Sequence, residues 1–133
     1  MVYTVTVLYP NEADAKYDLE YYLSHHLPLV DRLWRKYGLH GWTVVKYGPG
    51  VTEDRIPYSF GCVLFYEDDN AAKQAFKGPE AAEVLGDISK FSNKQPLFLY
   101  AREAQLAGFD MFCVGHAKKL GCFEWNGRYL QKY

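Results

Sequence analysis

The sequence predicts an α+β fold of the ferredoxin-like type, with the element order β-α-β-β-α-β. Short segments rich in β-branched and aromatic residues alternate with amphipathic helical patterns over the first hundred residues. Turn-forming residues separate these segments, as at Pro10-Asn11 and at Gly48-Pro49-Gly50. The chain has 133 residues, 49 % of them hydrophobic, which is enough for one domain with a substantial core.

The first three elements are expected to be a strand, a helical region and a second strand. Residues 2–8 alternate β-branched and aromatic side chains and end at a turn, which predicts a strand. Residues 13–38 carry apolar side chains at helical spacing. Pro28 is expected to stop or kink this helix, because proline lacks an amide N–H and disfavours a helical residue before it. A second helical segment would begin at Pro28 and end at Gly38, and residues 42–47 would form the second strand.

The second half repeats this pattern with a longer strand. Residues 58–66 are expected to form an aromatic strand, and the acidic residues at 67–69 cap a helix over residues 71–77. Gly78-Pro79 ends that helix, and residues 80–85 form a further short one. A loop that contains Asp87, Phe91 and Asn93 leads into the last strand, residues 96–100.

Two helices on one face of a four-stranded sheet leave the other face uncovered. Apolar residues alternate onto both faces of the first and third strands, so the open face would expose apolar surface to water. A second copy of the chain, packed sheet against sheet, is the simplest cover, and we therefore expect a homodimer.

The C-terminal residues 104–133 are expected to form an extension to a domain of residues 1–103. Residues 108–115 could be a short strand or an apolar arm over a partner. Residues 121–129 have the pattern of a hairpin with Asn126-Gly127 at its turn.

Composition excludes several classes of partner. The formal net charge is −1 without a basic stripe, which argues against nucleic acid. No apolar run reaches the ~20 residues of a membrane span, and the first residues lack the features of a signal peptide. The three cysteines form an odd set without framework spacing, so a reducing, cytoplasmic location is expected.

His26 is the first candidate for chemistry, because an imidazole can exchange protons near neutral pH. Tyr22 lies four residues earlier and would share its helix face. A capping role for His26 at the interrupted helix is the alternative, and the residues alone favour it. Turn and cap formation is likewise the simpler role for Asp87 and Asn93.

Metal and cofactor sites have little support. Cys113, His116 and Cys122 provide three possible ligands where a structural zinc site needs four. No glycine-rich nucleotide fingerprint occurs, and neither Ser24 nor Cys62 has the surroundings of a nucleophile. We therefore expect no metal and no cofactor.

A set of segments over residues 1–103 resembles the EthD family, in the family's order and at compatible spacing: residues 5–10, 17–23 and 26–30, Trp34, Gly41-Trp42, residues 86–88 and 91–93, and Pro96. The resemblance implies a dimeric α/β barrel of two ferredoxin-like subunits, each with a pocket between sheet and helices. His26-Leu27-Pro28 matches the family's His-x-Pro, which implies a functional role for His26. The chain beyond Arg102 departs from the family, which usually ends there.

Fungal members that resemble this chain are associated with polyketide tailoring as cofactor-independent decarboxylases or dehydratases. The leading hypothesis is therefore a cofactor-independent lyase that acts on an aromatic, polyketide-like substrate, with His26 as the proton shuttle. Tyr22 or Asp87 would orient the substrate, and the binding residues would be Trp34, Trp42, Phe60, Phe91 and Asn93. One alternative is a cofactor-free monooxygenase, or a cyclase or isomerase, of the same barrel superfamily. The other is a non-catalytic binding protein for a hydrophobic metabolite.

Overall fold

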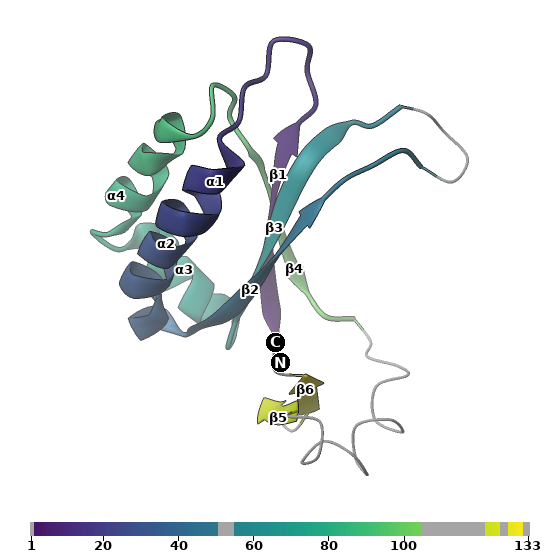
Figure 1. Ribbon diagram of the computed structural model, residues 1–133. Coiled ribbons are helices and arrows are strands. Elements are labelled where there is room, and N and C mark those ends of the chain that lie inside the picture. Colours follow the sequence, from purple (N-terminus) through teal and green to yellow (C-terminus); the bar gives the residue numbers. More distant parts are fainter. Residues whose placement is uncertain (1, 51–54, 105–121, 126–127, 132–133) are drawn as a thin grey trace.

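The computed structural model describes residues 2–50, 55–104, 122–125 and 128–131 and has the predicted α+β, ferredoxin-like fold. Its main sheet has four strands in the spatial order β2-β3-β1-β4, and every neighbouring pair is antiparallel. All helices of the described chain lie on one face of this sheet (Figure 1). The strands are β1 (Tyr3–Pro10), β2 (Leu39–Lys46), β3 (Tyr58–Tyr66) and β4 (Leu97–Arg102).

The helices form two groups that are separated in the sequence by β2 and β3. The first group is one run: α1 (Leu19–Tyr21), a π-helical segment (Tyr22–His26), α2 (Leu27–Trp34) and a 3₁₀ turn (Arg35–Tyr37). The second group comprises α3 (Asp69–Lys77), α4 (Ala81–Gly86) and a 3₁₀ turn (Asp87–Lys90). The carboxylate of Asp68 caps α3 by accepting the N–H of Ala71, as the acidic run predicts.

The helix does not stop at Pro28, so that half of the expectation of a stop or kink is wrong. A π-helical segment instead precedes the proline, and α2 begins at Leu27, one residue before the predicted start of the second segment. Leu27, directly before the proline, keeps helical backbone angles, and its N–H bonds to the carbonyl of Tyr22, five residues earlier. A widened π turn is one way for a helix to accommodate the missing N–H and the bulk of a proline ring. Leu27 and Trp34 are each only 2 % exposed, so burial of this helix outweighs the local preference of proline.

Gly38 ends this helical run, as predicted. Its φ is 102°, in the left-handed region that L-residues with a side chain rarely adopt. A Cβ at this position would also lie 2.9 Å from the Cβ of Ala71 on α3. The glycine therefore allows both the left-handed backbone and the close approach of α3.

The strand register sorts side chains between a covered and an open face of the sheet. Val7 pairs with Cys62 and with Phe98 in one row across the covered face. The next row, one residue along β1, belongs to the open face, where Leu8 pairs with Gly61 and Leu97.

The open face exposes apolar side chains of the two edge strands. The exposed fractions are 38 % for Val45, 45 % for Leu97 and 48 % for Leu99, and Tyr47, just after β2, is 40 % exposed. Within the described residues, the open face thus leaves apolar side chains exposed, as the sequence predicts.

The two strands of the expected C-terminal hairpin are present in the structure. β5 (Cys122–Trp125) and β6 (Arg128–Gln131) pair antiparallel, with Trp125 opposite Arg128. The predicted arm at 108–115, and the possible metal ligands Cys113 and His116, lie outside the described residues. The boundary at residue 103 stays a prediction. No helix in the described ranges is long and apolar enough to cross a membrane.

Candidate active site

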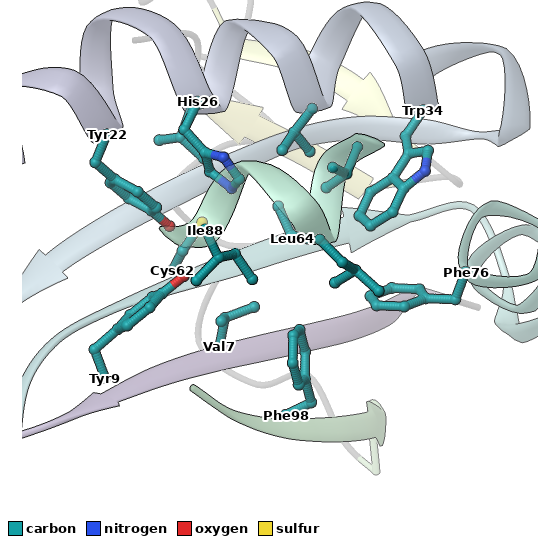
Figure 2. Close-up of a pocket in the computed structure, with 14 residues that line it drawn as sticks. Val7, Tyr9, Tyr22, His26, Trp34, Cys62, Leu64, Phe76, Ile88 and Phe98 are labelled. Carbon is teal, nitrogen blue, oxygen red and sulfur yellow. The ribbon is translucent and has the colours of Figure 1, made fainter. Parts of the chain in front are cut away.

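A small cavity lies between the helices and the covered face of the sheet (Figure 2). Its volume is about 30 Å³, roughly the space of one water molecule. Most of its lining is aliphatic or aromatic, and the polar exceptions are Tyr9, Tyr22, His26, Trp34 and Cys62. The cavity is therefore an apolar site with a few polar groups, the usual composition of a small-molecule pocket.

The imidazole of His26 projects from the π-helical segment toward this cavity (Figure 2). It is buried, and its Nδ1 lies 2.9 Å from Oδ2 of Asp87, a residue 61 positions later in the turn after α4. An ionised carboxylate can only accept hydrogen bonds, so neutral His26 carries its proton on Nδ1. Nε2 is then the ring nitrogen left with a free lone pair, as a general base requires.

The surroundings favour a neutral imidazole beside a charged carboxylate. Burial lowers the pKa of His26 and outweighs the opposing effect of the Asp87 carboxylate. Burial by itself would raise the pKa of Asp87, but hydrogen bonds from His26, Tyr21 and Lys90 hold it below its usual value. At neutral pH the pair therefore rests as an imidazole base oriented by a carboxylate anion.

Tyr22 and Cys62 form the neighbouring polar part of the cavity. The ring of Tyr22 stacks on that of His26 with a centroid distance of 5.4 Å. The hydroxyls of Tyr22 and Tyr9 both point toward the Cys62 sulfur (Figure 2). Burial raises the pKa of the Cys62 thiol to about 12 and that of the Tyr22 phenol far above its usual value. Both groups stay protonated at neutral pH, so Tyr22 can donate a hydrogen bond and Cys62 is a poor nucleophile.

The five predicted binding residues lie at different distances from the cavity. Trp34 lines it and packs on Phe76 at a centroid distance of 4.7 Å. Phe60 and Phe91 do not line the cavity but pack against residues that do. The ring centroids of Phe60 and Tyr9 are 4.4 Å apart, and those of Phe91 and His26 are 4.6 Å apart.

Trp42 and Asn93 are not in the cavity lining. Trp42 is partly buried against the core. Asn93 is exposed, and its amide bonds the carbonyl of Asp14 and the N–H of Lys16, which ties the loop before β4 to the segment before α1.

Sequence reasoning missed Tyr9, Cys62, Tyr21 and Lys90 as neighbours of this site. The strand pattern places Tyr9 and Cys62 on a buried face, but only the register shows that they line the same cavity as His26. Lys90 follows Asp87 by three residues, a spacing that already indicates a pair on a helical turn. The part of the chain that the structure describes contains no group of three or more His, Cys, Asp or Glu residues arranged to hold a metal.

Comparisons with known proteins support this fold. No protein-family model matches the chain. An uncharacterised 11.0 kDa protein of Rhodococcus erythropolis, encoded in the thcB-thcC intergenic region, is 26 % identical over 106 residues, which are 77 % of this chain and 95 % of that protein.

Three solved structures are similar to the chain over most of their length. An EthD-like protein of Ralstonia eutropha has a TM-score of 0.71 at 24 % identity and covers 82 % of this chain and 96 % of its own. An ethyl tert-butyl ether D family protein of Bacillus halodurans has a TM-score of 0.61 at 21 % identity, and the match covers 77 % of this chain and 99 % of that protein. A dimeric ferredoxin-like protein of unknown function from Jannaschia has a TM-score of 0.50 at 16 % identity, and the match covers 77 % of this chain and 98 % of that protein. The resemblance to the EthD family is thus confirmed at the level of the fold.

Proposed function

We propose that this chain is an EthD-type, cofactor-independent lyase, a decarboxylase or dehydratase of an aromatic, polyketide-like substrate, in which His26 transfers the proton. The observation that carries the proposal is the buried His26–Asp87 pair at the edge of an apolar cavity. A carboxylate that holds the far nitrogen of an imidazole is a common arrangement for a general base. An aromatic ring suits the aromatic and aliphatic lining.

Dehydration uses His26 in its resting, neutral state. Nε2 takes a proton from carbon, and the C–H electron pair forms the double bond as the hydroxyl group leaves. The imidazolium then returns its proton to the departing hydroxide, so that water is released and His26 is neutral again. Tyr22 would donate a hydrogen bond to a substrate oxygen, because its phenol stays protonated.

Decarboxylation starts instead from the protonated imidazole. The Nε2 proton is added to the carbon atom as the bond to the carboxylate breaks and carbon dioxide leaves, so each turnover consumes one proton. The lowered pKa of His26 reduces the protonated fraction at neutral pH and favours the base-first route. A kcat/KM that rises with pH through the His26 titration indicates dehydration, and one that falls indicates decarboxylation.

Substrate binding requires that the cavity widen, because its present volume suits a single water molecule. Leu85 both lines the cavity and is 40 % exposed, so we place the entrance beside it on α4. The Leu85→Trp variant should therefore bind aromatic acids more weakly while unfolding at the same temperature as the wild type. Unchanged binding by this variant would place the entrance elsewhere.

The activity is tested with the purified chain, a panel of aromatic hydroxy acids, and the His26→Gln variant. Loss of a general acid or base lowers kcat by typically ~10²–10⁴-fold, and this is the expected result. The exposed His40→Gln variant, on β2 and outside the cavity lining, is the matched control and should keep full activity. A fully active His26→Gln enzyme excludes the mechanism. Oxygen consumption would indicate a monooxygenase, and tight binding without turnover a carrier protein.

We also propose a homodimer in which the open faces of two sheets pack together, completing a barrel. The exposed side chains of Val45, Leu97 and Leu99 support it, since such a patch favours a partner. The similar Jannaschia protein is described as dimeric. Light scattering at micromolar concentration should give twice the mass of 15.4 kDa, and a monomer at that concentration excludes this assembly.

We propose a cytoplasmic location on the basis of the cysteines. The chain has three, and Cys62 is a free, buried thiol. Fractionation of cells that express the chain with a small tag should recover it with cytoplasmic marker proteins, and recovery in the medium would contradict this.

A further inference from the structure

We infer that Tyr21 and Lys90, which lie outside the cavity, are positioning residues that hold Asp87 from its outer side and thereby set the basicity of His26. The link from these contacts to catalysis rests on the proposed acid–base role of His26. The contacts that carry it involve no substrate, so it is testable on the protein alone.

Asp87 is bonded on two sides. Its Oδ2 faces inward and bonds Nδ1 of His26, whereas Oδ1 accepts the Tyr21 hydroxyl at 2.9 Å and lies 3.3 Å from Nζ of Lys90. The Asp87 side chain is 6 % exposed and that of Lys90 is 64 % exposed. The carboxylate therefore connects a buried imidazole to a group at the protein surface.

The outer side of Asp87 faces a broad surface groove rather than the cavity. This groove, about 720 Å³ in volume, lies between the α1–α2 run and α4 and is lined by Tyr21, Asp87 and Lys90 but not by His26. The cavity, conversely, is lined by His26 but not by Asp87. The His26–Asp87 hydrogen bond thus crosses the protein layer that separates the two spaces.

The local structure keeps Tyr21 in place. Tyr21 is the last residue of α1 and Tyr22 the first of the π-helical segment, so adjacent phenols serve the groove and the cavity. The Tyr21 ring also stacks nearly parallel on that of His25, at a centroid distance of 4.9 Å and an interplanar angle of 9°. Its hydroxyl is therefore directed at Asp87 without help from the substrate.

His26, Tyr21 and Lys90 all interact with the Asp87 carboxylate. Each of them weakens the interaction that the carboxylate makes with the other two. The Lys90 charge and the Tyr21 hydroxyl both stabilise the Asp87 anion, which makes it a weaker acceptor for His26. Lys90 also opposes a second positive charge on the imidazole. Removal of Tyr21 or Lys90 should strengthen the hydrogen-bonded ion pair between Asp87 and protonated His26, and should therefore raise the pKa of His26. Removal of the carboxylate itself should lower that pKa.

The other titratable groups near His26 do not produce this pattern. Tyr22, Tyr9 and Cys62 contact it or lie near it from the helix and the sheet, and all three keep raised pKa values and stay neutral. His25, Arg32 and Glu83 line the outer groove and are unchanged in the variants below. A His26 pKa that rises on loss of Tyr21 or Lys90 and falls on loss of the Asp87 carboxylate therefore identifies Tyr21 and Lys90 as the cause.

The test is an NMR titration of the His26 ring in the substrate-free protein, with its signals assigned from the His26→Gln spectrum. Lys90→Met and Tyr21→Phe should each shift the His26 titration to higher pH, and Asp87→Asn should shift it to lower pH. Lys90→Arg, which keeps the charge, should restore the wild-type value. Lys73→Met removes a similar exposed lysine, ion-paired with Asp69 on α3, and should leave the titration unchanged.

An unchanged or lowered His26 pKa in both Lys90→Met and Tyr21→Phe overturns the inference. A protein that titrates as expected but shows no lyase activity keeps the inference and rejects the proposed reaction. In an active enzyme, the pH profile of kcat/KM should move in the same direction as the titration in each variant, while a merely structural role would lower activity without moving the profile.

Discussion

The two faces of the sheet are built from the same four strands and differ sharply in their surroundings. On the covered face Phe60, Cys62 and Tyr66 of β3 are each at most 1 % exposed. On the open face the edge strands leave Val45, Leu97 and Leu99 more than one third exposed. Successive strand residues alternate between these faces, so neighbours in the sequence serve different purposes. The covered face holds the candidate site, and the open face is available for assembly.

The largest expected effect lies on the covered side, where Asp87→Asn should lower kcat by ~10²-fold or more, because His26 loses the carboxylate that orients its base form. Asp69→Asn removes a partly exposed carboxylate of α3 and should leave kcat nearly unchanged. Steady-state kinetics on folded, purified variants measures both. Equal losses in the two variants would show that Asp87 has no special role.

Truncation of β3 on its two faces should separate core packing from assembly. Phe60→Ala removes a buried ring stacked on Tyr9 and should lower the free energy of unfolding by roughly 3–5 kcal/mol. Phe65→Ala, on the open face, should cost less in a dilute monomer and should weaken the dimer instead. Urea unfolding at two protein concentrations distinguishes them. A larger loss for Phe65→Ala in the monomer would contradict the division between the faces.

A charge on the open face should break the proposed dimer with little effect on the protomer. Leu99→Asp places a carboxylate on the open face at edge strand β4, within the proposed contact, and should give a 15.4 kDa monomer in light scattering. Leu23→Asp, on the helical side and 52 % exposed, is the matched control and should not change the mass. Dissociation by both variants, or by neither, would remove the open face as the interface.

The smallest expected effect is a dependence of stability on pH that comes from the covered face. His26 titrates at a lower pH when folded than its usual 6.5, so the unfolded chain binds more protons between the two pKa values. Stability should therefore fall as the pH decreases below about 6.5, until the folded pKa is passed. Asp87 adds to the loss only at more acidic pH, as its own lowered pKa is passed. Unfolding of His26→Gln should lack the step below neutral pH, and an identical pH dependence would show that His26 does not cause it.

Local rules succeed where a residue's role depends on its sequence neighbours. β3 begins and ends at the predicted residues, Tyr58 and Tyr66, because its aromatic alternation is bounded by turn residues and charges. Gly38 ends its helix because a left-handed backbone needs glycine. Pro28 is the exception, since the helix tolerates it by widening one turn while Leu27 and Trp34 stay buried.

The candidate site was only partly predictable, because its residues come from segments that are far apart in the sequence. The sequence alone determined the period-two strands, the caps and the kinds of residue available for chemistry, His26, Tyr22 and Asp87 among them. Only the tertiary structure decided that Asp87 bonds His26 across 61 positions, that Tyr9 and Cys62 join the cavity through strand register, and that Asn93 lies outside it. Local patterns report on neighbours along the chain, whereas a site depends on which distant segments pack together.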